Sequence, residues 1–313
     1  MNGKTFKIGT RGSPLALKQA ELLKNAISPA HPDLAIEIIP IKSAADWKKQ
    51  DGEKALCTQN GGKGQFAKEI EALILDGTID CGVHSLKDMA STLPDGLVVD
   101  HYLPRADAGD AFICNNYSNL MDLPAGSVVG TCSPRRQAFI LSKRPDLKVV
   151  PFRGNVATRL EKIKSGQVDA TYLAMAGLER LGIKEDPMIY PVSIKDMLPA
   201  CGQGIICMEH RVDDHETCNI LKLAHDTHTG YCAIAEREVL RILDGSCHTP
   251  IAAYAVLENN ELHLQAIVAS LDGQEVYEEE LQAACTSEDE AQKIGSIIGE
   301  NIKSKLPEGF LDQ

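Results

Sequence analysis

The sequence predicts an α/β protein in which two similar domains precede a small α+β domain. The chain has 313 residues, which is longer than a typical single domain. A strand, a Gly-Thr pair, a Ser-Pro pair and a helix follow one another at residues 5–27, and the same order returns at residues 127–143. From residue 231 onward the pattern changes to a helix, strands and a last helix. A repeated order of this kind is typical of two related α/β domains.

The first half of the chain alternates between strand and helix patterns. Ser13 and Pro14 are typical of a helix start, because serine caps the first turn and proline fits it. Residues 43–62 are polar and predict a long loop, which we expect to close over bound ligand. The expected strands are residues 5–9, 34–41 and 78–85, and the expected helices are residues 15–27 and 63–75.

The second half repeats this order. Ser133-Pro134 and Gly154-Asn155 each precede a helix pattern. The segment QVDATYLAMAG at residues 167–177 resembles TIDCGVHSLKD at residues 78–88, so each half has a helix, a glycine and then a strand that starts with Ile-Asp or Val-Asp. The expected strands of this half are residues 127–130 and 148–152.

The C-terminal part begins after a glycine-rich segment at residues 198–204, which we interpret as a crossing back to the first domain. Asp272-Gly273 is a hairpin turn signal. Ser287 and Glu290 have the spacing of a capping box before the last helix. The expected elements are a helix at residues 231–243 and strands at residues 251–257, 262–270 and 274–281.

Composition excludes several classes of function. A net charge of −12 and an aromatic content of 4% argue against a general nucleic-acid binder. No apolar run approaches 18 residues, so we expect no membrane span. With ten cysteines and no visible export signal, we expect reduced thiols and a cytoplasmic protein. Cys218, His225, His228 and Cys232 match no common zinc spacing, so we expect no metal.

The segment from Gly130 to Arg159 is basic within an acidic chain, with seven basic residues against one acid. Arginines lie next to turn or helix-start signals, where free backbone N–H groups also attract anions. A guanidinium matches a carboxylate or a phosphate with two parallel hydrogen bonds. We therefore expect a pocket for several carboxylates or phosphates, and a solvated basic helix face is the alternative.

Two further residues have both a chemical and a structural interpretation. Asp88 follows a predicted strand, where a carboxylate could move protons or stabilise a cation, or simply form a turn. Cys247 lies in the small-residue loop DGSCHTP, where its thiol could react, or be one more buried cysteine.

Motifs along nearly the whole chain resemble those of the porphobilinogen deaminase family, also called hydroxymethylbilane synthases. They follow one another in the family's order, and several are individually specific. The motifs are TRGSPLAL, GGKGQFAKEIE, VHSLKD, DAFI, GTCSPRRQ, FRGNVATRL, LAMAGLERLG, LPACGQG and CHTPIAAYA.

The resemblance implies a dipyrromethane cofactor bound through a thioether to Cys247, with Asp88 as the catalytic carboxylate. The implied substrate is porphobilinogen, of which four units are joined head to tail with loss of ammonia, and the growing oligopyrrole carries acetate and propionate groups. We expect Arg135→Ala or Arg153→Ala to leave folding intact and to stop cofactor assembly or chain growth. The implied cofactor and substrate contacts are Arg11, Ser13, Lys63, Lys87, Thr131, Ser133, Arg135, Arg136, Arg153, Gly154, Asn155, Arg159, Arg180 and Gln203.

The resemblance also implies a division into three domains and a monomer. The first two domains would be similar α/β domains like those of periplasmic binding proteins, and the third a small α+β domain. The expected domains are residues 1–103 with 204–222, residues 104–203, and residues 223–313.

Two other classes of protein remain as alternatives. One is a two-domain protein that binds a dicarboxylate without catalysis, and it predicts an export signal or a partner domain. The other is a cysteine hydrolase, which predicts a free thiol at Cys247 that alkylating reagents modify.

Overall fold

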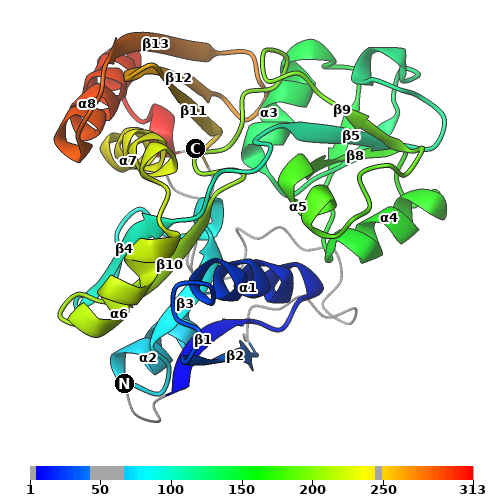
Figure 1. Cartoon of the computed structure of the whole chain (residues 1–313). Helices are drawn as coiled ribbons and strands as arrows, with labels where there is room; N and C mark the ends of the chain where they lie inside the picture. Colours follow the sequence, from blue (N-terminus) through cyan, green and yellow to red (C-terminus); the bar gives the residue numbers. More distant parts are fainter. Residues whose placement is uncertain (1–4, 43–66, 244–248, 313) are drawn as a thin grey trace. The chain divides into compact units, whose positions relative to one another are not determined.

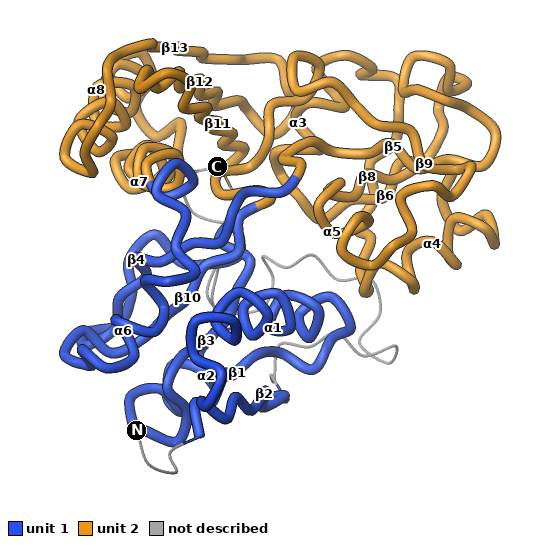
Figure 2. Tube along the Cα trace, viewed as in Figure 1, with its two compact units in different colours: residues 1–46, 63–106, 205–230 blue, residues 47–62, 107–204, 231–313 orange. Residues whose placement is uncertain are grey.

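The computed structural model describes residues 5–42, 67–243 and 249–312. The chain divides into two compact units, which Figure 2 shows in different colours. Among the described residues, unit 1 comprises residues 5–42, 67–106 and 205–230. Unit 2 comprises residues 107–204, 231–243 and 249–312. The chain therefore returns from unit 2 to unit 1 directly after the glycine-rich segment that ends at Gly204.

Unit 1 contains a five-stranded mixed sheet with helices on both faces. Its elements are β1 (Thr5–Arg11), α1 (Pro14–Ile27), β2 (Ala35–Ile41), α2 (Lys68–Leu75), β3 (Cys81–Ser85), η3 (Leu86–Asp88), β4 (Leu97–Tyr102), β10 (Ile206–Arg211), α6 (His215–Leu221) and η5 (Lys222–Ala224).

The strand order in this sheet is β2-β1-β3-β10-β4 (Figure 1). β1 is parallel to β2 and β3, whereas β10 is antiparallel to β3 and β4. Leu23 of α1 and Leu221 of α6 pack with Met208 on one face of the sheet. Ile70 and Ile74 of α2 pack with Leu97 on the other face.

Unit 2 contains a second five-stranded sheet and a three-stranded sheet. The elements of the five-stranded part are β5 (Asp110–Cys114), η4 (Leu120–Asp122), β6 (Val128–Gly130), α3 (Pro134–Lys143), β7 (Lys148–Val150), α4 (Val156–Lys164), β8 (Ala170–Ala174), α5 (Met175–Arg180) and β9 (Ile189–Pro191).

The order of this sheet, β7-β6-β8-β5-β9, repeats the pairing pattern of unit 1. β6 is parallel to β7 and β8, and β5 is antiparallel to β8 and β9. The predicted α/β class with two similar sheets is thus confirmed by the strand pairing.

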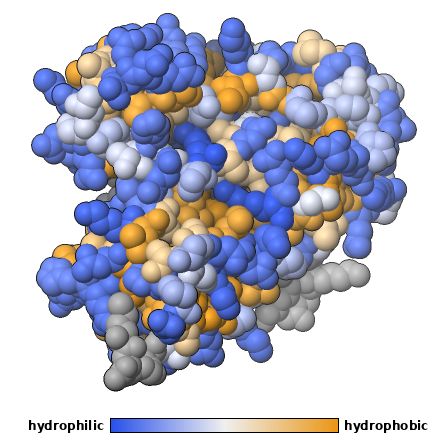
Figure 3. Space-filling view, in the orientation of Figure 1, coloured by the Kyte–Doolittle hydropathy of each residue, from blue (hydrophilic) through white to orange (hydrophobic). Residues whose placement is uncertain are grey.

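The rest of unit 2 is an antiparallel sheet packed against two helices. Its elements are α7 (Thr227–Ile242), which begins in unit 1, β11 (Ile251–Glu258), β12 (Glu261–Ala269), β13 (Val276–Ala284), α8 (Glu288–Lys305) and η6 (Phe310–Asp312). Apolar side chains such as Val239, Leu264 and Ile298 form its core, which confirms the predicted small α+β part. Figure 3 shows mostly hydrophilic residues where α8 and β13 face outward.

Most predicted elements are present, and the strands that the sequence analysis missed have a common cause. Ser13, Ser133 and Ser287 cap α1, α3 and α8 as expected. The sequence analysis did not identify β4, β5, β9 and β10, which pair only with distant segments of the chain. The helix expected over residues 63–75 begins at Lys68 in the described part. The polar loop at residues 43–62 lies outside the described residues.

Candidate active site

In unit 1, the predicted site residues gather at one edge of the five-stranded sheet. Arg11 ends β1, and Lys87 and Asp88 form a helical turn directly after β3. Because β1 and β3 are parallel neighbours, their carboxyl ends lie at the same edge. Ser13 caps α1 by accepting a hydrogen bond from the Ala16 amide at 3.3 Å. The edge therefore presents a cation, a hydroxyl and a carboxylate from two neighbouring strands.

Asp88 is exposed, and hydrogen bonds of the neighbouring residues Ser85 and Leu86 fix its turn. The Leu86 amide donates to the Ile205 carbonyl at 3.0 Å, and Leu86 itself is buried. Gln19 of α1 donates through Nε2 to the Ser85 hydroxyl at 2.8 Å. An anchored turn with an exposed carboxylate can present that carboxylate to a ligand with little rearrangement.

A buried contact between a histidine of β3 and a glutamate of β10 was not identified by the sequence analysis. His84 Nε2 lies 3.1 Å from Glu209 Oε2, and the Glu209 side chain is fully buried. Neither residue is far from Glu71, whose pKa is raised by burial and by the charge of Glu209. His84 is part of the VHSLKD motif, but its partner is 125 residues away in sequence and belongs to β10.

In unit 2, the predicted site residues again gather at the carboxyl ends of parallel strands. Thr131 and Ser133 follow β6, Arg153 and Asn155 follow β7, and Arg180 lies on the helix after β8. Ser133 Oγ accepts from the Arg136 amide at 3.4 Å, and Asn155 Oδ1 accepts from the Thr158 amide at 2.9 Å. Two helix N-termini and several arginines therefore lie at one edge of this sheet.

Gly154 has a backbone conformation that other residues rarely adopt. Its φ is +120°, and a Cβ there would lie 2.9 Å from Cγ2 of Thr158. Arg159 donates from Nε to the Gly154 carbonyl at 2.9 Å, and Lys162 donates to the Arg153 carbonyl at 2.9 Å. These bonds hold the short loop that carries Arg153, which is itself 6% exposed.

Arg135 and Arg136 share a buried carboxylate, Asp110. Nη2 of each arginine donates to one Asp110 oxygen at 2.6 Å. Their Nη1 atoms donate to the carbonyls of Leu198 and Tyr172, each at 2.7 Å. Gln203 adds a bond from Nε2 to Asp110 Oδ1 at 3.1 Å. The predicted basic segment thus contains an internal ion network as well as groups at its surface.

The electrostatics of this network favour an ionised Asp110. Burial acts to raise the pKa of Asp110, but the two guanidiniums outweigh it and hold that pKa well below its usual range. The Nε atoms of both arginines are buried and have no hydrogen-bond partner among the described residues. Asp110 opens the DAFI motif, so its presence was visible in the sequence, whereas its role depends on the fold.

Lys63 and Cys247 lie outside the described residues. Arg180 is placed, and it donates from Nη2 to the Gly204 carbonyl at 2.7 Å, while burial lowers its pKa to about 10.

Two family models match the chain and define its class of protein. The family model described as "Porphobilinogen deaminase, dipyromethane cofactor binding domain" matches residues 6–219. A second model, "Porphobilinogen deaminase, C-terminal domain", matches residues 230–304. Together these two models span most of the chain and both sets of strand ends described above.

The chain belongs to the porphobilinogen deaminase family. A chloroplastic porphobilinogen deaminase of Oryza sativa subsp. japonica is 45% identical over 312 residues, covering 98% of this chain and 86% of the relative.

Solved structures also show similarity at low sequence identity. A periplasmic VFT2 domain of BvgS from Bordetella pertussis has a TM-score of 0.41 and 14% identity, covering 70% of this chain and 86% of that one. A TRAP periplasmic solute-binding protein from Pseudomonas putida F1 has a TM-score of 0.40 and 10% identity, covering 76% and 81%.

Proposed function

We propose that this chain joins four porphobilinogen units head to tail on a dipyrromethane cofactor and then releases linear hydroxymethylbilane by hydrolysis. Membership of the porphobilinogen deaminase family supports this function over a dicarboxylate-binding protein without catalysis. The observation that carries the proposal is the edge of the second sheet, where arginines and two capped helix N-termini follow parallel strands.

The donor set at this edge fits a cofactor with acetate and propionate groups. A dipyrromethane carries several carboxylates, and guanidiniums and helix N-termini are the groups that bind carboxylates best in proteins. When bound, the cofactor supplies the pyrrole carbon to which the first substrate unit is joined. We assign its binding in unit 2 to Thr131, Ser133, Arg135, Arg136, Arg153, Gly154, Asn155, Arg159, Arg180 and Gln203.

These residues would act in different ways. Arg159 and Lys162 hold the loop that carries Arg153, where the charges of Arg153 and Arg159 can attract carboxylates. Arg135, Arg136 and Gln203 are bound to Asp110, so we assign them the additional task of fixing the start of α3. Gly154 permits this close turn, where a Cβ would lie 2.9 Å from Cγ2 of Thr158.

We assign the proton and charge chemistry to Asp88. Loss of ammonia from porphobilinogen leaves a cationic azafulvene, which a nearby carboxylate stabilises. Asp88 is exposed on an anchored turn, and Arg11, Ser13 and Lys87 at the same edge would bind the substrate carboxylates. We include Lys63 among these contacts on the basis of the family motif alone.

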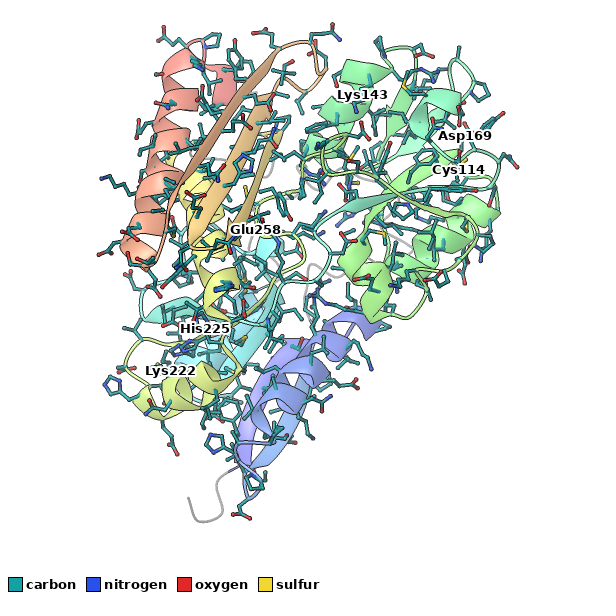
Figure 4. All side chains as sticks on the ribbon, turned by 45° about the horizontal axis from the view of Figure 1, so that its top comes forward. Cys114, Lys143, Asp169, Lys222, His225 and Glu258 are labelled. Atoms are coloured by element: carbon teal, nitrogen blue, oxygen red, sulfur yellow. The ribbon has the colours of Figure 1, made fainter. Side chains whose placement is uncertain are left out.

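The attachment of the cofactor to Cys247 is testable by intact mass. We expect the purified protein to be heavier than its sequence by two linked pyrrole units, and reductant should leave this mass in place because a thioether is not reducible. Cys247→Ser should lose both the extra mass and the activity. Cys114→Ala is the matched control, because Cys114 is buried on β5 (Figure 4) and should keep both. An active protein of unmodified mass would refute the attachment.

Three further proposals concern organisation. We propose that residues 1–103 with 204–222, residues 104–203 and residues 223–313 are separate domains, which limited proteolysis would test. We propose a monomer, and light scattering of the purified protein is the measurement. We also propose a cytoplasmic location, because we expect the ten cysteines of the chain to be reduced thiols. Among the described helices, none combines the length and the hydrophobicity that a membrane span requires.

A further inference from the structure

A group of three metal-ligating side chains lies in unit 1, on strands β4 and β10. Asp100 Oδ1 lies 3.0 Å from His210 Nε2 and also contacts His101 Nδ1. The ligand atoms of these three residues all lie within 4.8 Å of one another. The His101 and His210 side chains are 7% and 2% exposed, whereas the Asp100 side chain is 42% exposed. The group is therefore buried on its imidazole side and open to solvent on its carboxylate side.

An irregularity in the strand pairing brings these residues together. Met208 pairs with His101, but Glu209 pairs with Val99, so Asp100 is an extra residue in β4. Neighbouring residues of a regular strand point to opposite faces of the sheet. A β-bulge changes this alternation and re-aims a side chain, which lets Asp100 and His101 contact each other.

The backbone contact of His210 favours the neutral tautomer in which the nitrogen that faces Asp100 carries no proton. His210 Nδ1 lies 2.8 Å from the Arg211 carbonyl oxygen, which can only accept, so the ring proton belongs on Nδ1. In the neutral ring, Nε2 then directs a lone pair at a carboxylate oxygen. A carbonyl partner on the far nitrogen is the usual arrangement of a histidine that binds a metal.

His101 also faces Asp100 through one ring nitrogen. Its Nε2 lies 4.0 Å from the Cys218 sulfur on α6, and its Nδ1 faces Asp100. The His225 ring lies edge-on to it, with the ring centroids 5.6 Å apart, and His225 Nδ1 accepts from the Tyr102 amide at 3.2 Å (Figure 4 labels His225). The position of His101 is thus fixed by packing against α6 and against the segment that follows α6.

One carboxylate oxygen therefore faces two imidazole nitrogens. Two imidazolium ions would place like charges next to each other, since the ring centroids of His101 and His210 are 5.4 Å apart. A single divalent ion satisfies both nitrogens and the oxygen together. Ligand atoms around tetrahedral zinc lie about 3.3 Å apart, which is close to the His210–Asp100 distance.

We propose that Asp100, His101 and His210 bind a divalent transition-metal ion of the Zn²⁺ type. Two imidazoles favour such an ion over Mg²⁺ or Ca²⁺, which prefer oxygen ligands. Three protein ligands leave one position for water on the exposed side of Asp100. The ion would join β4, an edge strand, to β10, and so stabilise the sheet that carries Asp88.

The experiment uses the cofactor-bearing protein after treatment with a chelator. Because the chain has ten cysteines, Co²⁺ is the better probe, since thiolate ligands add a charge-transfer absorption that nitrogen and oxygen ligands do not. We expect one equivalent of Co²⁺ to bind without that absorption, Zn²⁺ to compete for it, and the midpoint of thermal unfolding to rise with ion concentration.

Variants distinguish this site from other metal binding. His210→Gln and Asp100→Asn should each lower the affinity by more than the roughly 10–100-fold that loss of an outer hydrogen-bond partner costs. His263→Gln is the matched control, because His263 is half-exposed on β12 beside Glu280 and should bind as the unaltered protein does. Unchanged affinity in both site variants, thiolate absorption, or no stoichiometric binding would overturn the proposal and leave a protonated His–Asp cluster.

Discussion

Replacing Asp110 tests whether the two arginines next to it depend on that carboxylate. Asp110 is 1% exposed, and it accepts hydrogen bonds from Arg135, Arg136 and Gln203. Asp110→Asn keeps the shape of the side chain and removes its charge, so two buried guanidiniums would lose their only carboxylate partner among the described residues. Removing one partner of a buried ion pair costs about 3–5 kcal/mol. That is a large part of the roughly 5–15 kcal/mol that stabilises a typical domain.

The measurement is urea unfolding of the purified protein followed by circular dichroism. Asp146→Asn is the matched control, because Asp146 also pairs with an arginine through two oxygens, at 2.7 Å each, but at the surface. Exposed pairs contribute little. We therefore expect a clear fall in the urea midpoint for Asp110→Asn and a much smaller one for Asp146→Asn. Equal midpoints in the two variants would refute the argument that burial makes this network important.

The same geometry changes what truncation of Arg135 should do. The sequence suggests that Arg135→Ala leaves folding intact, because it places the side chain in a ligand pocket. In the structure, however, Arg135 is 4% exposed and also donates to the Leu198 carbonyl. Its removal leaves an acceptor and a carboxylate less satisfied in the interior. We therefore expect Arg135→Ala to lose stability as well as activity.

Three other perturbations have definite expected results. Asp88→Asn should bind porphobilinogen but lose about 10²–10³ in rate, since an amide cannot balance the cation, and single-turnover kinetics within a few-fold of the unaltered protein would contradict this. Because the pKa of Asp110 is lowered on folding, its contribution to stability is present above the ordinary Asp pKa of about 3.9 and is lost as pH falls toward the lower folded value. Acid unfolding should therefore be less steep in Asp110→Asn. Gly154→Ala should lose about 1–3 kcal/mol, measured by urea unfolding, because alanine is strained at its φ of +120°. Gly12→Ala, at an open position, is its control.

The sequence predicts those parts of the fold that local patterns determine. Ser13 and Ser133 cap helices as their Ser-Pro pairs indicate, and Ser287 does the same at α8. Asp272-Gly273 forms the predicted turn between β12 and β13. Each of these features depends on residues that are close in sequence, so no knowledge of the rest of the fold is needed.

The parts that the sequence did not reveal depend on distant partners. Residues 206–211 become a strand because β3 and β4 provide hydrogen bonds on both sides, and both strands are more than a hundred residues earlier. For the same reason Glu209 gains His84, and His210 gains Asp100. The role of Asp110 is equally hidden, since a motif names the residue but not the arginines that surround it.

The position of β10 links the two halves of the proposed catalytic machinery. In unit 2, β5 is the first strand of the five-stranded sheet in sequence and β9 is the last, so this sheet is contained in residues 110–191. In unit 1, β10 lies between β3 and β4, so the sheet is incomplete until residues 206–211 have been added. The turn that bears Asp88 is hydrogen-bonded to Ile205, at the start of that returning segment. The sheet edge that carries Asp88 is therefore completed by a segment that follows the whole arginine-bearing sheet in the sequence.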